Sequence, residues 1–263
     1  MAKESISVTS VDGLCLDAMV HRPDTPTASR GTVIQAHGIT VDMDEGGMFI
    51  RLADGLAEAG FAVLRFSFRG HGRSEGTQRG VTIAGEMLDL QAVVNHAGVS
   101  LPEPLSIVAA SFGAVSTVLS LPYLETQLHG IVLWNPVLDL RHTFIEPELA
   151  WGLENFGPRG REQLRATDHL LIDGEFELGR VAFQEMDVYE PLRAWAASTV
   201  PGLVIHGDRD SYVSYDIARQ AATTRPGTQF RTVAGSGHGF DSPEREDEAI
   251  AATVTWLTSR SAP

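Results

Sequence analysis

Cysteine, long apolar runs and positive charge are scarce in this sequence, and each scarcity excludes a class of protein. Cys15 is the only cysteine among 263 residues, so the chain cannot form an internal disulfide. No cysteine and histidine residues have the spacing of a zinc site. No apolar run approaches the ~18 residues of a membrane span, and the first residues lack the apolar core of a signal peptide. We therefore expect a soluble, cytoplasmic protein that holds no metal.

Basic residues are outnumbered by acidic ones, 20 against 34, which gives a formal net charge of −14. An acidic surface repels the phosphates of nucleic acids and the headgroups of anionic lipids. We therefore expect neither nucleic acid nor a membrane as a partner. This charge is compatible with a small neutral substrate, because surface charge mainly maintains solubility.

Short β-branched runs alternate with amphipathic helical patterns through most of the chain. The expected strands are 6–9, 14–20, 32–36, 61–66, 105–110, 131–134, 202–206 and 229–233. The expected helices are 49–57, 83–97, 114–121, 215–222 and one that begins at Ser242-Pro243, with Gly60 and Gly98 ending the first two. Repeated strand–helix units predict a mostly parallel sheet covered by helices on both faces. The Asp12-Gly13 turn adds an antiparallel hairpin at one edge.

The alternation breaks between residues 137 and 191, where glutamate, arginine, tryptophan and phenylalanine accumulate. We interpret residues 1–136 and 192–263 as the core and 137–191 as an inserted lid with short helices. Such an insertion lies over the carboxyl edge of the sheet, where open α/β folds bind ligands. Its exposed surface is also a candidate contact for a homodimer. Four of its aromatic residues are candidates to line a substrate pocket or to pack the insertion itself: Phe144, Trp151, Phe156 and Phe176.

Ser111 follows the apolar run 105–110 and has small residues two positions before and after it. This pattern is typical of a nucleophile elbow, in which a tight strand-to-helix turn presents one side chain. The consensus is Gly-x-Ser-x-Gly, and Ala109 replaces its first glycine while Gly113 retains the second. A helix N-cap is the structural alternative for the same serine.

A serine nucleophile needs a histidine base and an acid that orients the histidine, in the chain order serine, acid, histidine. Of the nine histidines, only His238 follows the last two expected strands, where glycines flank it in a loop. The alternative is that His238 is a surface histidine in a flexible loop. The acid should follow strand 202–206, where Asp208 and Asp210 are both candidates. Asp139 is a more distant candidate.

Hydrolysis also needs backbone N–H groups that stabilise the oxyanion. One candidate belongs to Phe112, directly after the serine. The other belongs to Ile39, in the His37-Gly38-Ile39 loop that follows strand 32–36. We interpret His37 as a structural histidine that bonds nearby backbone.

Taken together, these motifs resemble the α/β-hydrolase superfamily over nearly the whole chain. The resemblance rests on His37-Gly38, Arg69–Ser74, Ala109–Gly113, Gly207–Asp210 and Gly237-His238, in this order. The sequence is most similar to the cinnamoyl/feruloyl esterases and the serine aminopeptidase-like hydrolases. The resemblance implies an eight-stranded, mostly parallel sheet with a small helical lid. It also implies that Asp210 is the acid and that Ile39 and Phe112 supply the oxyanion donors.

We therefore predict a serine hydrolase that cleaves a carboxylic ester through an acyl-enzyme, with a cinnamoyl-type aromatic acyl group as one candidate. A small-molecule ester is the expected partner, and neither a metal nor an organic cofactor is expected. A thioesterase, a lactonase, a peptidase or amidase and a carbon–carbon bond hydrolase are alternatives on the same scaffold. A non-catalytic binding protein is the alternative of a different class.

Overall fold

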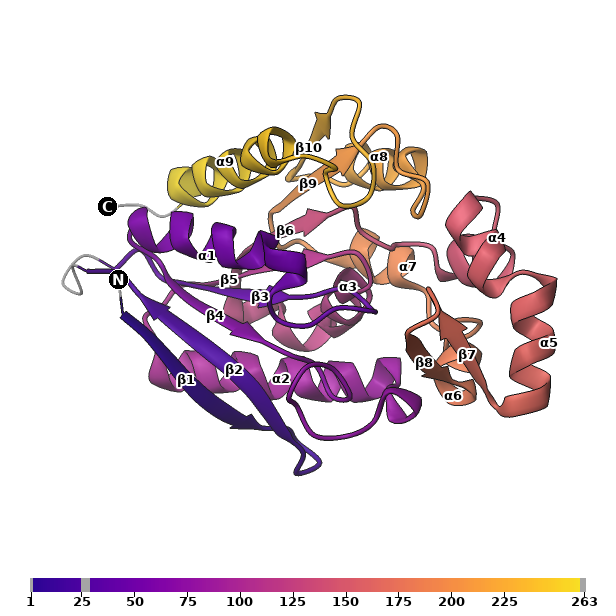
Figure 1. Ribbon diagram of the computed structural model, residues 1–263. Helices are drawn as coiled ribbons and strands as arrows, with labels where there is room; N and C mark the ends of the chain where they lie inside the picture. Colours follow the sequence, from indigo (N-terminus) through magenta and orange to yellow (C-terminus); the bar gives the residue numbers. More distant parts are fainter. Residues whose placement is uncertain (1, 25–28, 261–263) are drawn as a thin grey trace.

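The computed structural model of the chain describes residues 2–24 and 29–260 and contains one central sheet of eight strands (Figure 1). The strands lie in the order β1-β2-β4-β3-β5-β6-β9-β10. β1 and β2 form an antiparallel hairpin, β2 is antiparallel to β4, and all other neighbours are parallel. Their bounds are β1 Ala2–Thr9, β2 Cys15–Arg22, β3 Thr32–Ala36, β4 Ala62–Phe66, β5 Leu105–Ala110, β6 Leu128–Trp134, β9 Gly202–Gly207 and β10 Thr228–Val233. The predicted eight-stranded, mostly parallel sheet is confirmed.

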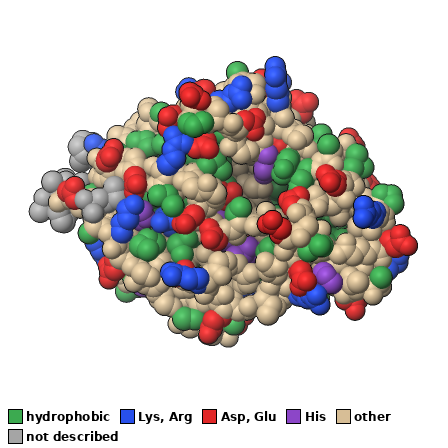
Figure 2. Space-filling view, viewed as in Figure 1, with side chains coloured by type: hydrophobic (Ala, Val, Ile, Leu, Met, Phe, Trp, Pro, Cys, Tyr) green, Lys and Arg blue, Asp and Glu red, His purple; other side chains and the backbone are tan. Residues whose placement is uncertain are grey.

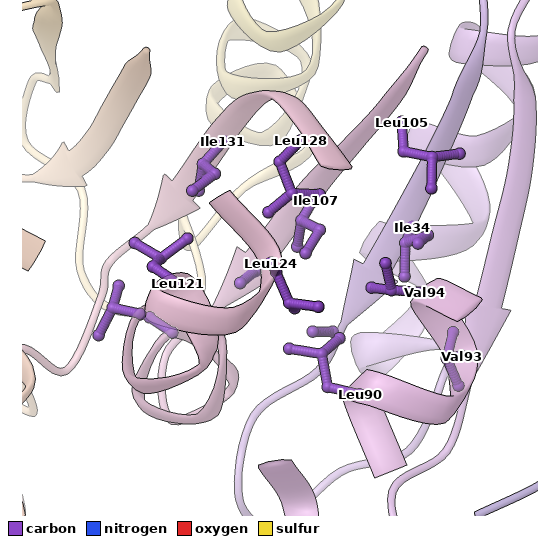
Figure 3. Packing of buried hydrophobic residues seen from close by; sticks show 14 of the residues in the cluster. Ile34, Leu90, Val93, Val94, Leu105, Ile107, Leu121, Leu124, Leu128 and Ile131 are labelled. Atoms are coloured by element: carbon purple, nitrogen blue, oxygen red, sulfur yellow. The ribbon is translucent and has the colours of Figure 1, made fainter. Parts of the chain in front are cut away.

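The central strands are buried on both faces, and successive side chains point to opposite faces. Ile107 of β5 belongs to the core beneath the sheet, whereas its neighbour Val108 belongs to the core on the other side. Figure 3 shows Ile34, Ile107 and Ile131 facing side chains of two helices that cover one face. The helices of this side are α2 (Ile83–Ser100), α3 (Gly113–Leu124), α7 (Pro191–Ala197) and α8 (Tyr215–Thr223), and those of the other side are α1 (Met48–Glu58) and α9 (Pro243–Arg260).

The helix expected to stop at Gly98 continues to Ser100, so that predicted boundary is wrong. The Leu101 N–H still donates to the Ala97 carbonyl at 2.9 Å, which closes one more helical turn past the glycine. Glycine favours a helix end but does not require one, and packing of α2 against the sheet maintains the helical conformation through Gly98.

The parallel strands end level with one another at a single edge of the sheet. Ala36 pairs with Ala109, and Ala110 pairs with Trp134. Trp134 in turn pairs with Ile205. The loops that follow β3, β5, β6, β9 and β10 therefore meet at this edge, as ligand-binding loops do in open α/β sheets.

Residues 137–191 lie beyond the same edge, on the right in Figure 1. They contain a π-helix (Arg141–Ile145), α4 (Ala150–Phe156), α5 (Pro158–Thr167), β7 (His169–Ile172), β8 (Phe176–Gly179) and α6 (Arg180–Glu185). The short helices match the expectation, but the antiparallel β7–β8 hairpin was not predicted. Its turn carries Asp173 at φ 52° and Gly174 at φ 75°, an Asp-Gly hairpin signal that the sequence does contain.

The surface carries its acidic excess in dispersed form. On the face shown in Figure 2, acidic side chains (red) and basic side chains (blue) are interspersed. Large exposed apolar side chains are separated along the sequence, for example Val99, Tyr123 and Val188. Across residues 2–24 and 29–260, no helix combines the length and the apolar composition needed to cross a membrane.

A buried carboxyl group joins the first turn of α2 to the first turns of α3. Glu86 is 2% exposed and accepts a hydrogen bond from the Ser116 hydroxyl at 2.5 Å. Burial raises the pKa of Glu86 from 4.5 to about 8, and this effect exceeds the opposing influence of the Ser116 hydrogen bond. The carboxyl group is therefore neutral in the folded protein near pH 7, while in the unfolded chain it is ionised.

We predict that Glu86→Gln stabilises the protein at neutral pH by about 3 kcal/mol. Ionisation of Glu86 at neutral pH stabilises the unfolded wild-type chain, and a glutamine cannot ionise, so the unfolded variant lacks this stabilisation. The amide still offers an oxygen to Ser116. The raised pKa means that wild-type stability falls as pH rises above 4.5 and levels off above about 8. Urea unfolding at several pH values measures this, and a difference between the two proteins that does not shrink toward pH 4.5 contradicts the assignment.

Candidate active site

Ser111 lies in a strained turn between β5 and α3. Its φ is 50°, in the left-handed region that non-glycine residues rarely adopt. Its N–H donates to the Trp134 carbonyl at 2.9 Å, and its own carbonyl accepts from the Val137 N–H at 3.0 Å. These bonds fix the turn to the end of β6, so the serine side chain has a defined position at the sheet edge.

The residues on either side explain the spacing that the sequence showed. A Cβ atom on Gly113 would lie 2.4 Å from the His37 carbonyl oxygen and 2.5 Å from that of Ala36. Only glycine therefore fits two positions after the serine. Ala109 is fully buried in β5, and its methyl group is accommodated, so the departure from the consensus leaves the turn intact.

The structure brings Ser111, His238 and Asp210 into one hydrogen-bonded chain. The Ser111 Oγ lies 2.9 Å from His238 Nε2, and His238 Nδ1 lies 2.7 Å from Asp210 Oδ2. A carboxylate only accepts, so Nδ1 carries the proton and the Nε2 lone pair faces the hydroxyl. Each of the three residues follows a different strand, β5, β9 or β10, which is why residues distant in sequence meet here.

The two other candidate acids have different partners. Asp208 is exposed and accepts the Gly235 N–H at 2.6 Å, which joins two loops at the surface. Asp139 accepts the His142 N–H at 3.0 Å at the start of the 137–191 segment. Neither carboxylate forms a hydrogen bond to His238 among the residues that the structure describes.

The Asp210 carboxylate is buried and receives hydrogen bonds from four donors. Its Oδ1 accepts the backbone N–H groups of Tyr212 and Val213 at 2.8 and 3.0 Å. Its Oδ2 accepts from His238 and, at 3.1 Å, from the buried His206. Burial by itself would raise the pKa of Asp210, but His238 and the hydrogen bonds from His206 and His238 outweigh it. The pKa lies well below its usual range, so the group stays ionised.

Two further features hold the His238 loop in place. The Asn135 side-chain amide donates to the His238 carbonyl, and its oxygen accepts the Gly207 N–H at 2.9 Å. Asn135 has a φ of 42°, another left-handed residue at the same edge. The Gly237 N–H donates to the Asp241 carboxylate, which ties the start of the loop to its end.

Two aromatic rings are stacked over the histidine. The Tyr212 ring lies parallel to the His238 ring, with centroids 4.9 Å apart. Trp151 of α4 stacks in turn on Tyr212, with ring centroids 5.0 Å apart. The indole N–H of Trp151 donates to Asp173 at 2.8 Å. The 137–191 segment therefore contacts the histidine through the tyrosine that follows Asp210.

The loop after β3 borders the same cavity, and His37 fixes its backbone. The Phe68 N–H donates to His37 Nε2, so the protonated His37 Nδ1 donates to the Gly38 carbonyl at 2.7 Å. In a trans peptide, the Ile39 N–H points opposite to that carbonyl. His37 thus bonds nearby backbone as expected, and burial holds its pKa well below the ordinary value. Ile39 and Phe112 both line the cavity that contains Ser111.

That cavity has a volume of about 510 Å³ and opens between the sheet edge and the 137–191 segment. Its walls combine apolar and polar side chains. The residues lining it include Ile39, Val41, Glu45, Met48, Val137, Phe144, Trp151, Asp173, Arg209, Tyr212, Val213 and Asp241. Residues 2–24 and 29–260 contain no cluster of three or more histidine, cysteine or acidic side chains suited to a metal ion.

A family model described as serine aminopeptidase, S33, matches residues 27–176, which is more than half of the chain. The chain belongs to this family. The family is one of hydrolases with the α/β-hydrolase fold, as the sequence motifs predicted. The comparison with curated proteins finds no matching sequence.

Solved structures with the same fold cover nearly the whole chain. Est1E from Butyrivibrio proteoclasticus, bound to ferulic acid, has a TM-score of 0.82 at 20% identity, covering 96% of this chain and 98% of its own. A hydrolase described as putative from Agrobacterium vitis S4 has a TM-score of 0.78 at 22% identity, covering 97% and 98%. The esterase Pf2001 from Pyrococcus furiosus has a TM-score of 0.73 at 20% identity, covering 99% and 93%.

Two of the four aromatic residues proposed for substrate binding line the cavity of this hydrolase, and two lie elsewhere. Phe144 and Trp151 face the cavity. Phe156 is fully buried against both of them, with ring centroids 4.8 and 5.5 Å away. Phe176 stacks on the His71 ring at 4.8 Å.

His71 gives the Arg69–Ser74 motif a structural role. Its Nε2 lies 2.6 Å from the Ile39 carbonyl oxygen, so the loop braces the segment after β3. Several cavity residues were not predicted. Tyr212 and Val213 could have been found, because they follow Asp210 closely in the sequence. Glu45 could not, because its place in the cavity depends on the path of the loop between β3 and α1.

We predict that Gly113→Ala destabilises the protein by about 2–3 kcal/mol, because its methyl group would overlap two backbone carbonyls that cannot move independently. Ala109→Gly, which restores the consensus, is the matched control. It should cost only about 1 kcal/mol, from a flexible residue and a lost methyl contact in β5. Urea unfolding measures both, and a larger loss for Ala109→Gly than for Gly113→Ala would contradict this account of the turn.

Proposed function

We propose that the protein is a serine hydrolase that cleaves carboxylic esters through a covalent acyl-enzyme. The observation that carries this proposal is the continuous chain from Ser111 Oγ through His238 to the ionised Asp210, at a strained turn beside an open cavity. A hydroxyl is a weak nucleophile unless a base removes its proton as it attacks.

In the proposed reaction, Ser111 Oγ attacks the ester carbonyl while His238 Nε2 accepts the hydroxyl proton. Asp210 stabilises the resulting imidazolium and keeps its ring in the orientation that faces the serine. The imidazolium then donates the proton to the leaving alcohol, and the acyl group remains on Ser111. A water molecule repeats the same steps with His238 as base and releases the acid.

The negative charge on the carbonyl oxygen needs donors during both steps. We assign these to the N–H groups of Ile39 and Phe112. The His37 contact to the Gly38 carbonyl supports the first assignment, since it fixes the peptide plane. The position of Phe112 at the start of α3 supports the second, since unpaired N–H groups of a helix N-terminus favour anions.

We further propose that residues 137–191 act as a lid and that the acyl group is aromatic. The aromatic side chains of Phe144, Trp151 and Tyr212 line the cavity, which supports an aromatic acyl group. Ferulic acid bound to Est1E supports the same class of substrate. The description of the family as serine aminopeptidases makes amide cleavage the second candidate.

We predict that Ser111→Ala and Asp210→Asn each lower kcat for a p-nitrophenyl ester by about 10³-fold or more, because each breaks the relay. Asp208→Asn is the matched control from the same loop and should retain nearly full activity. Aminoacyl arylamides assayed in parallel separate esterase from peptidase activity. Equal losses in the two aspartate variants, or faster cleavage of the arylamides, would contradict the assignment.

A further inference from the structure

Glu45 is a buried acid in the cavity that the proposed reaction does not use. It begins the short 3-10 helix Glu45–Gly47 in the loop between β3 and α1. Its φ is 47°, so its backbone is held in the left-handed region without the freedom of glycine. The side chain is 9% exposed and lines the same cavity as Ser111. Strained residues of this kind persist where the surrounding structure fixes them, often at functional sites.

The carboxyl group of Glu45 is bound to the peptide that precedes the proposed oxyanion donor. Its Oε2 accepts the Gly38 N–H at 2.7 Å. A Cβ on Gly38 would lie 3.3 Å from Ser111 Cβ and 3.4 Å from Glu45 Oε1. The acid and the nucleophile therefore lie against the same glycine. This arrangement fixes the peptide from one side, while His37 fixes the Gly38 carbonyl from the other.

No lysine or arginine forms an ion pair with this carboxyl group in the part of the chain that the structure describes. Arg65 of β4 pairs instead with Asp44, in the same loop as Glu45. Arg69 pairs with Asp12 and Asp89. An ionised Glu45 would therefore place a negative charge that has no ion-pair partner beside the atoms on which the oxyanion forms.

We propose that Glu45 is a further positioning residue of the active site, which in its neutral form anchors the Gly38 N–H and so orients the following Gly38–Ile39 peptide for oxyanion binding. This inference rests on the proposed ester hydrolysis. A neutral carboxyl still accepts the Gly38 N–H through its carbonyl oxygen, and it adds no charge that opposes the oxyanion.

The electrostatic surroundings agree with a neutral acid. Burial raises the pKa of Glu45 from 4.5 to about 7, which exceeds the lowering effects of the Gly38 N–H and of His238. Asp42 in the same loop adds to the rise. The other charged groups that line the cavity come from three loops: Asp173 in the β7–β8 turn, Arg209 after β9 and Asp241 after His238.

The protonation state of Glu45 then affects the reaction. Glu45 must be neutral, so kcat/KM falls as pH rises through about 7. A variant whose side chain at this position accepts the same hydrogen bond but cannot ionise should not show this alkaline fall.

The test is the pH profile of kcat/KM for p-nitrophenyl acetate in wild type, Glu45→Gln and Asp42→Asn. Wild type should lose about tenfold or more above neutral pH, as expected for one unit charge close to another. Glu45→Gln keeps the acceptor for Gly38 but cannot ionise, so its profile should reach an alkaline plateau. Asp42→Asn, the matched control in the same loop, should retain the alkaline fall. Glu45→Ala should have a kcat/KM about tenfold below that of Glu45→Gln at every pH, because it removes the hydrogen-bond acceptor for the Gly38 N–H.

An alkaline fall that persists in Glu45→Gln, or a wild-type profile without one, would overturn the inference while leaving ester hydrolysis intact. Infrared difference spectra supply a readout that does not depend on turnover. Wild type minus Glu45→Gln should contain a carboxylic-acid carbonyl band that disappears as pH rises through about 7. Glu86 contributes equally to both spectra and cancels. Absence of the band at pH values below its pKa would also overturn the inference.

Loss of the proposed function would look different. If wild type neither hydrolyses esters nor reacts with a fluorophosphonate at Ser111, the mechanism fails and the positional role of Glu45 fails with it. If labelling and turnover are normal but the pH profiles of wild type and Glu45→Gln coincide, only the Glu45 inference fails.

Discussion

The Asp210 carboxylate accepts hydrogen bonds from two histidine side chains and two backbone amides. Burying a charge is costly unless every lone pair has a partner, and here the four donors offset that cost. In doing so they join the end of β9, the loop that follows it and the His238 loop. The position of the base relative to Ser111 depends on this one buried anion, and so does the position of Tyr212, whose ring lies against His238.

The 137–191 segment is attached to the same centre. Trp151 stacks on Tyr212, and its backbone N–H donates to the Ser211 carbonyl at 3.4 Å. Its core is continuous with the loops of the sheet edge, because Phe144 packs against Phe112 with ring centroids 5.7 Å apart. The proposed lid and the proposed catalytic residues are therefore physically coupled: a change in the segment that moves Trp151 is transmitted to the Tyr212 ring, which lies over His238.

Local sequence patterns predict the sheet well and the site in part. Buried strands such as β3 and β5 are short and mostly apolar, and their bounds were predicted to the residue. Ser111 and His238 could be placed together because each follows a strand and parallel strands end at one edge, whereas the choice of Asp210 over Asp208 depended on the family resemblance. Asn135 and Glu45 were not predicted, because their roles come from left-handed backbone and long-range contacts. The β7–β8 hairpin was missed although Asp173-Gly174 signals it, since the polar composition around it favoured helices.

The central claim is that Ser111 is a nucleophile activated by this arrangement, and covalent labelling tests it most directly. The protein is treated with a fluorophosphonate, digested and analysed by mass spectrometry. The account predicts one adduct, on the peptide that contains Ser111, which is absent from Ser111→Ala and strongly reduced in Asp210→Asn. An unmodified Ser111 in the folded wild-type protein, or an adduct on another residue that persists in Ser111→Ala, would contradict it.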